Sequence, residues 1–198
     1  MVQNVRTITI SLFLLWSGTT IRAQLATTAI HQFFRDNPQY ESDGFDYPVG
    51  PPDGKKYYNA QKFGQNTHLG DDWNGVGGGN TDMGDPVYST ANGLVVFAQN
   101  IGGGWGNVVR VVHVVSEKPL VLVESLYAHL ERIDVKEGQG IRRGEKLGTI
   151  GNAGGIYYAH LHFEIRTEYG MEVGGGYSTE TKGYTDPTAF IKKHRPVR

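Results

Sequence analysis

The 198-residue chain contains no cysteine. This absence excludes disulfide bonds, thiol catalysis, thiolate metal sites and a lipid attached to a cysteine at the end of a leader. Any metal ion must therefore be bound by imidazole and carboxylate groups. The formal net charge is only −1, so no strong field favours nucleic acid or an anionic membrane as a partner.

The sequence also lacks an apolar run long enough to span a bilayer, which needs about 20 residues. A shorter run, Ile8–Trp16, follows Arg6 and fits the apolar part of a secretory leader with a cleavage site after Ala23. We therefore expect residues 1–23 to be a signal peptide of an exported protein, periplasmic or extracellular. No stable membrane insertion is expected after cleavage. An uncleaved anchor and a buried N-terminal strand or helix are the alternatives.

Glycine, by contrast, is abundant, with 28 residues, and there are 11 tyrosines. Three glycine clusters stand at residues 77–79, 102–104 and 174–176. Neither a P-loop lysine nor a Rossmann strand–turn–helix setting accompanies them, so they predict turns rather than nucleotide binding. The aspartates near the first cluster also lack the spacing of a calcium-binding loop.

From residue 86 onward, about six segments have the residue pattern of strands separated by short turns. They are VYST, GLVVFAQ, WGNVVRVVHVV, PLVLVESLYAHL, two short strands within VKEGQGIRRGEKLGTIG, and HLHFEIR. The pattern predicts a mostly β domain with a single antiparallel sheet or flattened barrel and few short helices. Helices are expected within residues 24–36 and 186–194, while residues 63–85 are expected to be loop.

We expect one domain at residues 63–191, preceded by a segment at 24–62 packed on the core and followed by a basic tail at 192–198. The segment is rich in proline and aromatic residues, which suits an ordered path over the sheet. Two interpretations of Tyr47 and its neighbours Tyr57 and Tyr58 stay open. They either cover one edge of the sheet or line a groove that leads to the functional site.

In the stretch YYAHLHFEIR, two histidines stand one residue apart within a predicted strand. Because strand side chains alternate, His160, His162 and Glu164 face one way and the apolar residues between them face the other. One imidazole can bind a metal ion while its neighbour carries protons. The alternative is a pair of half-exposed histidines on a solvated face of the sheet.

The stretch THLGDDW places His68 and Asp72 four residues apart. In a straight strand their backbones would lie about 13 Å apart, too far to share one ion at about 2 Å per bond. The chain must bend between them, and Gly70 is placed to allow the bend. His129, in SLYAHL, is expected on the same face as Tyr127 by alternation; the alternative is a surface histidine at a strand end.

These motifs together resemble the lysostaphin-type zinc metallopeptidases, also called LytM-domain peptidases. The motifs are His-x-Gly-x-Asp at 68–72, Tyr-Ala-His-Leu at 127–130 and His-Leu-His-Phe-Glu at 160–164. The likeness runs in the family's order from Phe63 to Ile191 and includes GDPVYSTANGLVVFA, WGNVVRVVH and VKEGQGIRRGEKLGTIGNAG. Asp71 departs from the family pattern, in which an apolar residue is more usual, and is expected to add charge beside the site.

The resemblance implies that His68, Asp72 and His162 bind one zinc ion per chain. It also implies that His129 and His160 are unligated active-site histidines. Two imidazoles and one carboxylate with an open fourth position are typical of catalytic zinc. Glu164 is expected to act through a neighbour or structurally rather than in the reaction itself.

The function implied is a secreted zinc metalloendopeptidase that hydrolyses peptide cross-links of bacterial peptidoglycan. The alternative is a catalytically inactive LytM-like domain that binds or activates other cell-wall hydrolases. Such domains lose zinc ligands or the unligated histidines, whereas all five positions are kept here. A biotin or lipoyl carrier is not favoured, because the glycine-paired hairpin has Arg142 and Arg143, and no lysine, at its turn. The oligomeric state is left open by the sequence.

Overall fold

The computed structural model describes residues 27–196, so the predicted leader lies outside the described part. The chain divides into two compact units after Asn37. In the first unit, residues 27–36 form a helix, within the range expected from the sequence. Among the residues that the structure describes, no helix is long and apolar enough to cross a membrane.

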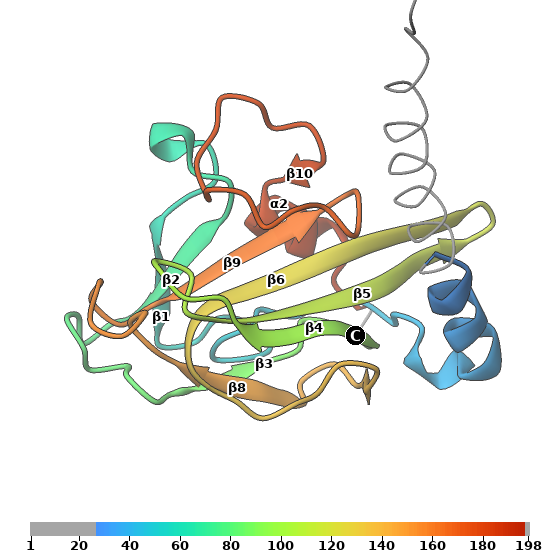
Figure 1. The fold of residues 1–198 in the computed structure, drawn as a ribbon, viewed down its shortest axis with the longest axis horizontal. Helices are drawn as coiled ribbons and strands as arrows, with labels where there is room; N and C mark the ends of the chain where they lie inside the picture. The colour runs from blue at the N-terminus through green and yellow to red at the C-terminus, as the bar shows by residue number, and fades with distance from the viewer. Residues whose placement is uncertain (1–26, 197–198) are drawn as a thin grey trace, which may run out of the picture. The chain divides into compact units, whose positions relative to one another are not determined.

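Within the described residues, the second unit consists mainly of ten strands that pair into one antiparallel sheet (Figure 1). The strands are β1 (Tyr57–Gln61), β2 (Asp71–Gly75), β3 (Pro86–Tyr88), β4 (Gly93–Asn100), β5 (Asn107–Glu117), β6 (Leu120–Ile133), β7 (Gly140–Ile141), β8 (Lys146–Ile150), β9 (Leu161–Arg166) and β10 (Tyr184–Thr185). The other elements are the α-helix α2 (Pro187–Lys193) and the 3-10 turns η1 (Pro38–Tyr40) and η2 (Gln65–Thr67). The predicted mostly β class with an antiparallel sheet is confirmed.

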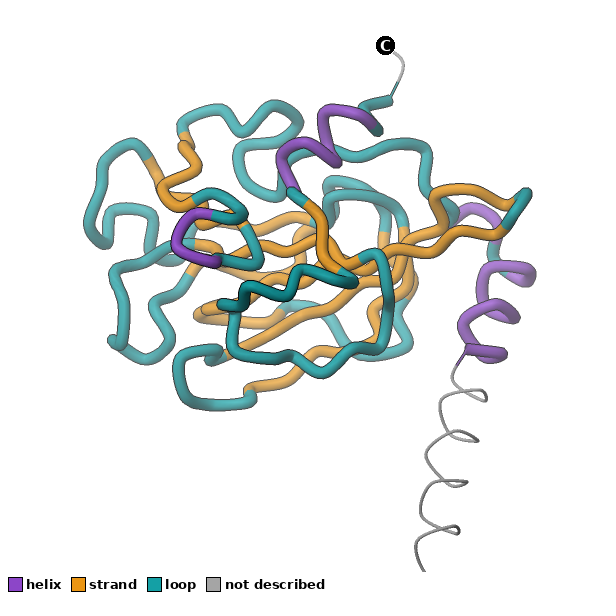
Figure 2. The backbone as a smooth tube through the Cα atoms, turned by 90° about the horizontal axis from the view of Figure 1, so that it is seen from above, coloured by secondary structure: helices purple, strands orange, loops and turns teal. Residues whose placement is uncertain are grey.

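The order of strands along the sheet is β1-β2-β9-β6-β5-β4-β7. β10 pairs with β9, and β8 pairs with β3 and β6. Strand β9 therefore lies between two strands that come from distant parts of the sequence, as Figure 1 shows. Figure 2 shows the strands from above, with loops and turns around them. This placement of β9 positions the candidate site.

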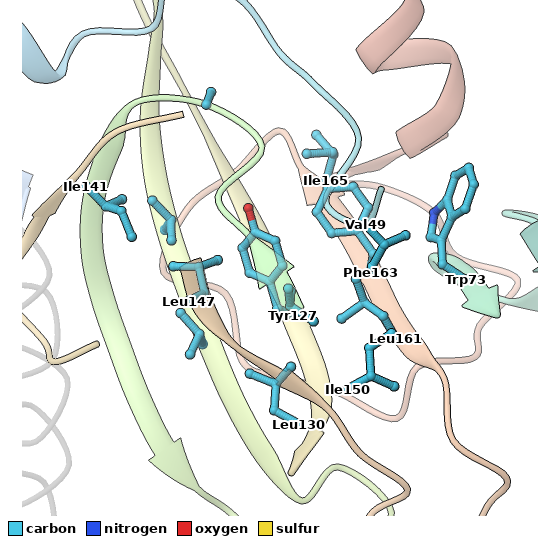
Figure 3. Packing of buried hydrophobic residues seen from close by; sticks show 14 of the residues in the cluster. Val49, Trp73, Tyr127, Leu130, Ile141, Leu147, Ile150, Leu161, Phe163 and Ile165 are labelled. Carbon is cyan, nitrogen blue, oxygen red and sulfur yellow. The ribbon is translucent and has the colours of Figure 1, made fainter. Parts of the chain in front are cut away.

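Both faces of β9 are buried along its whole length. Its apolar residues Leu161, Phe163 and Ile165 pack into the main core with Tyr127 and Ile150 (Figure 3). Each such side chain contributes about 1.5–3 kcal/mol on burial. The polar side chains of β9 alternate with them and occupy the opposite face, as the strand pattern predicted.

The expectation of a loop over residues 63–85 is wrong at β2. This strand pairs with β1 on one side and with β9 on the other. Its alternate residues are buried, and Trp73 packs in the core against the ring of Tyr47 with centroids 5.1 Å apart. The polar and glycine-rich composition of DDWNG hides this alternation, because only one of its five residues is strongly apolar.

The stretch that precedes residue 63 contributes to the core and to the sheet edge. Phe45 and Val49 are buried in the main core, and β1 forms the edge of the sheet. The hydroxyl of Tyr57 donates a hydrogen bond to Asp85 at 2.7 Å. For Tyr47 and Tyr57, these contacts support the interpretation that they cover the edge of the sheet.

The closing helix α2 forms where the sequence predicts it. The Asp186 side chain accepts a hydrogen bond from the Ala189 N–H at 2.8 Å, and Pro187 occupies the first turn. Both features are preferred at helix starts. After the helix, Arg195 forms ion pairs with Asp46 at 3.0 Å and Asp53 at 2.6 Å.

Candidate metal centre and active site

Three predicted ligands converge on one point. Nδ1 of His162 lies 3.0 Å from both Nε2 of His68 and Oδ1 of Asp72, and the last two atoms are 3.3 Å apart. Within the described part of the chain, no other group of three or more histidine, aspartate or glutamate side chains has donor atoms close enough to share an ion.

The spacing of these donor atoms fits zinc. Zinc binds imidazole nitrogen and carboxylate oxygen at about 2.0–2.2 Å, and adjacent donors of a tetrahedron then lie about 3.3–3.6 Å apart. The observed triangle is slightly tighter and has the same shape. Three donors leave one corner of the tetrahedron open, which is the arrangement of catalytic sites.

The pairing of β2 with β9 brings two of the ligands together. Asp72 and His162 are directly opposite each other in the register of these antiparallel strands. Side chains of such a pair have their Cβ atoms about 4.5–5.5 Å apart. Their separation of 90 positions in the sequence is therefore bridged by the sheet itself.

His68 reaches the cluster from outside the strand. It has extended backbone angles and forms an isolated bridge with Tyr177. Gly70, which separates it from β2, does not adopt a left-handed conformation. A Cβ at this position would lie 2.6 Å from the Phe163 carbonyl oxygen and 3.1 Å from the His162 ring. Glycine is needed here for close approach.

The second ring nitrogen of His162 is also occupied. Nε2 donates to Oε1 of Glu164 at 2.9 Å, and Oε2 of Glu164 accepts from Nε of Arg166 at 2.7 Å. Glu164 and Arg166 are fully buried. Because a proton on Nε2 leaves Nδ1 free, the carboxylate sets the tautomer that a metal ligand needs.

The carboxylates of Asp72 and Glu164 favour a positive charge at the His162 ring. Burial alone would raise the pKa of Asp72, but hydrogen bonds from His162 and His68 hold it below its usual range. Burial alone would lower the pKa of His162, yet Asp72 and Glu164 raise it to about 9. The position thus stabilises a positive charge, whether proton or metal ion.

The two histidines predicted to be unligated lie beside the triangle. The rings of His129 and His160 have centroids 4.7 Å apart, and Nε2 of His160 lies 3.8 Å from Oδ1 of Asp72. Nδ1 of His160 donates to the Tyr158 carbonyl at 2.8 Å. A carbonyl can only accept, so in the neutral ring Nε2 is the free acceptor on the side of Asp72.

His129 does not share a face with Tyr127, and the expectation from alternation is wrong. Its φ is +61°, a left-handed conformation, and a bulge follows at the next residues of β6. The ring packs against Trp105 and His160, while Tyr127 packs in the core against Phe163. Burial, together with neighbouring histidines, lowers the pKa of His129 to about 3.

A groove of about 500 Å³ opens over these side chains. Its walls include three aromatic residues that the sequence did not single out for the site, Trp105, Tyr157 and Tyr177. Tyr157 packs on His129 with ring centroids 5.0 Å apart, and Tyr177 packs on His68 at 5.1 Å. All three residues stand in or beside glycine-rich loops, a signal that could have marked them as groove residues.

Asp71 is not beside the metal centre, contrary to the expectation from the sequence. Its Oδ2 accepts hydrogen bonds from the N–H of Thr188 at 3.1 Å and from its hydroxyl at 2.6 Å. Its Oδ1 accepts from the N–H of Phe63 at 3.0 Å. The alternation of β2 places Asp71 on the opposite face from Asp72, where it joins the strand to the first turn of α2.

Comparisons with known proteins agree with this geometry. The profile of Peptidase family M23 matches residues 72–174, just over half of the chain. Peptidoglycan DD-endopeptidase ShyA of Vibrio cholerae is 36% identical over 83 residues, which are 42% of this chain and 18% of that protein. Murein hydrolase activator NlpD of Escherichia coli is 37% identical over 83 residues, 42% of this chain and 20% of that protein.

The matched segment thus spans about a fifth of these curated relatives. Among solved structures, the antimicrobial peptidase lysostaphin from Staphylococcus simulans has the same fold. Its TM-score is 0.51 at 22% identity, with 75% of this chain and 54% of that chain covered. From the profile match and the fold, the chain belongs to Peptidase family M23.

Proposed function

We propose that the chain is an exported zinc metalloendopeptidase that hydrolyses peptide cross-links of bacterial peptidoglycan. The observation that carries the proposal is the convergence of five side chains, four of which line one groove. Three of them, His68, Asp72 and His162, offer donor atoms with the spacing of a zinc site. The other two, His129 and His160, line the same groove without belonging to the donor triangle.

When bound, zinc would lower the pKa of a coordinated water toward neutrality and polarise a peptide carbonyl. His160 is suited to take a proton from the attacking water, because its Nδ1 proton is held by the Tyr158 carbonyl and its Nε2 is free. The same atom can then give that proton to the leaving amine. His160, the first histidine of His-Leu-His, is therefore the proposed general base.

His129 is suited to stabilise the oxyanion. Its Nδ1 is buried with no hydrogen-bond partner among the described residues. A buried N–H without an acceptor is rarer than a buried acceptor without a donor, so the proton belongs on Nε2. An Nε2–H directed into the groove can donate a hydrogen bond to the negative oxygen that develops during peptide hydrolysis.

The cell-wall substrate is supported by the relatives rather than by the groove. ShyA is named as a peptidoglycan DD-endopeptidase and NlpD as a murein hydrolase activator. The leader predicted at residues 1–23 would export the chain to the compartment that contains this substrate. The groove itself is open and lined by aromatic rings and glycine backbone, which suits an extended peptide.

A role as an inactive activator of other hydrolases is the second candidate. The likeness to NlpD favours it, because that relative is named as an activator. The retention of all five site residues favours the peptidase.

Digestion of purified peptidoglycan by the zinc-loaded chain separates the two candidates. A peptidase releases cross-link fragments that mass spectrometry identifies, and His160→Ala abolishes their release. An activator releases none by itself and raises the rate of an added cell-wall hydrolase. The second result would contradict the proposed activity.

A further inference from the structure

A chain of buried charges leads away from the metal centre on the far side of His162. Glu164 contacts the His162 ring with one oxygen and Arg166 with the other. Arg166 lies 3.7 Å from Glu124, and Glu124 accepts two hydrogen bonds from Arg110, each at 2.8 Å. Both glutamates and Arg166 are fully buried, and Arg110 is 9% exposed.

The two arginines also hold the backbone of residues 170–178, which we call the groove strap. Arg166 donates from Nη1 to the Glu172 carbonyl at 3.2 Å and from Nη2 to the Val173 carbonyl at 2.9 Å. Arg110 donates to the Met171 carbonyl at 2.9 Å. In Figure 1 the strap belongs to the long connection between β9 and β10.

The other end of the groove strap is hydrogen-bonded to the residues on either side of His68. The N–H of Leu69 donates to the Gly176 carbonyl at 2.9 Å, and the N–H of Ser178 donates to the Thr67 carbonyl at 2.8 Å. Between these ends, the strap forms one wall of the groove with residues 175–177. The wall is therefore fixed by the neighbours of both metal-binding histidines.

We propose that Arg166 is a positioning residue that couples the orientation of His162 to the position of the groove strap. The proposal rests on the proposed zinc site. One planar guanidinium satisfies the Glu164 carboxylate and two strap carbonyls at once. A movement of the strap must therefore change the support of the His162 ring, and binding of zinc must in turn restrain the strap.

Stability alone does not account for this arrangement. Buried ion pairs stabilise little compared with apolar residues of the same volume, because removing both charges from water is costly. The ion pair between Arg166 and Glu164 supplies a fixed geometry instead. Lysine keeps the positive charge but has no planar fork, and it cannot reproduce three hydrogen bonds in these directions. Arg166→Lys therefore separates geometry from charge.

The test combines zinc affinity with amide hydrogen exchange, which reports local opening. In Arg166→Lys, we expect zinc affinity to fall about tenfold, as for other partners behind a metal ligand. The amides of the groove strap should exchange at least several-fold faster, and KM for a peptide substrate should rise. Arg110→Lys, which contacts the strap but not Glu164, should speed strap exchange and lower zinc affinity by less than Arg166→Lys does.

The matched control is Arg132→Lys, since Arg132 is exposed and its ion pair within the described part of the chain is with Asp134. It should change neither zinc affinity nor strap exchange. If Arg166→Lys does not fold, the unaltered chain decides: zinc should slow exchange in the strap, and unchanged exchange would refute the coupling. Unchanged zinc affinity and strap exchange in a folded Arg166→Lys variant would also refute it.

These outcomes are distinct from failure of the proposed function. A chain that binds zinc but cleaves no peptide contradicts the peptidase and leaves the coupling to be judged by affinity and exchange. A chain that binds no zinc contradicts both proposals.

Discussion

The two candidate histidine ligands turn different ring nitrogens toward the donor triangle. His68 offers Nε2, whereas His162 offers Nδ1 because Glu164 accepts a hydrogen bond from its Nε2. The support of the two rings is correspondingly unequal. His162 is held by a buried carboxylate, while Nδ1 of His68 has no hydrogen-bond partner among residues 27–196 and its ring is packed against Tyr177.

We expect each of the variants His68→Ala, Asp72→Ala and His162→Ala to lose zinc. Each change removes one of three protein ligands, and no cysteine is present to replace it. Metal analysis after gel filtration should find about one zinc per chain in the parent and far less in the variants. His31→Ala, outside the site, is the control. Full zinc occupancy in His162→Ala would overturn the ligand assignment.

The unligated histidines should affect turnover without affecting metal content. In His129→Ala and His160→Ala, zinc should persist while the rate falls about a hundredfold or more, as expected for lost acid–base or oxyanion groups. Metal analysis and steady-state kinetics on the same preparations measure both quantities. Loss of zinc in His160→Ala alone would mean that the roles within His-Leu-His are exchanged.

The motifs singled out the five candidate site residues, but they did not predict how the side chains meet. The left-handed backbone of His129 has no residue signal, because non-glycine residues seldom adopt it. Gly70 lies in a bend, as expected, and its missing Cβ in addition allows the close approach of β9, which was not expected. Both features depend on contacts between distant segments, which a local pattern does not contain.

At the scale of elements, the site depends on β2 entering the sheet beside β9. Asp71 and Asp72 are consecutive residues with opposite tasks, since alternation directs one toward α2 and the other toward the metal centre. A shift of one residue in the register would exchange the two carboxylates. The hydrogen bonds from Thr188 and Phe63 to Asp71 therefore help to fix the register of the ligand strand.

Asp71→Ala tests this division of tasks. It leaves the N–H groups of Thr188 and Phe63 without their acceptor, which should lower the free energy of unfolding by about 1–3 kcal/mol. Zinc content should stay near one per chain, because Asp71 is not in the donor triangle. Chemical denaturation and metal analysis give the two values. A large loss of zinc with unchanged stability would place Asp71 in the metal centre instead.

The strands β3 to β9 were predicted from their strand-like residue pattern, and helix α2 from its proline in the first turn, whereas the two-residue strand β10 was not predicted. The strands β1 and β2 were not predicted, since their stretches are short and rich in polar residues and glycine. Their strand character comes from pairing with β9 and from the burial of Trp73. Tertiary contacts of this kind override local propensity.

At the scale of the whole molecule, the described residues include a fourth buried histidine, His113, which lies outside the candidate site. His113 is fully buried, its Nδ1 donates to the Asn92 carbonyl at 2.8 Å, and its Nε2 is hydrogen-bonded to the Ser125 hydroxyl at 2.7 Å. Burial favours the neutral ring. Burial lowers the pKa of His113 to about 4 from an ordinary value of 6.5.

The pH dependence of stability should reflect this ring. Below about pH 6.5 the unfolded chain binds a proton at His113, while the folded chain does not bind it until about pH 4. The contribution is therefore complete above pH 6.5 and is lost as the pH falls toward 4, by at most about 3 kcal/mol. Denaturation curves of the parent and of His113→Gln should show a smaller loss in the variant over this range. An equal loss in both would contradict the assignment, and His31→Gln is the control.

The most direct test of the metal centre is X-ray diffraction from crystals grown with zinc, measured on both sides of the zinc absorption edge. We expect one anomalous peak within about 2.0–2.2 Å of three atoms, Nε2 of His68, Oδ1 of Asp72 and Nδ1 of His162. His129 and His160 should remain unligated beside it. A peak bound by His160 or His129, or no peak in this triangle, would contradict the catalytic zinc site.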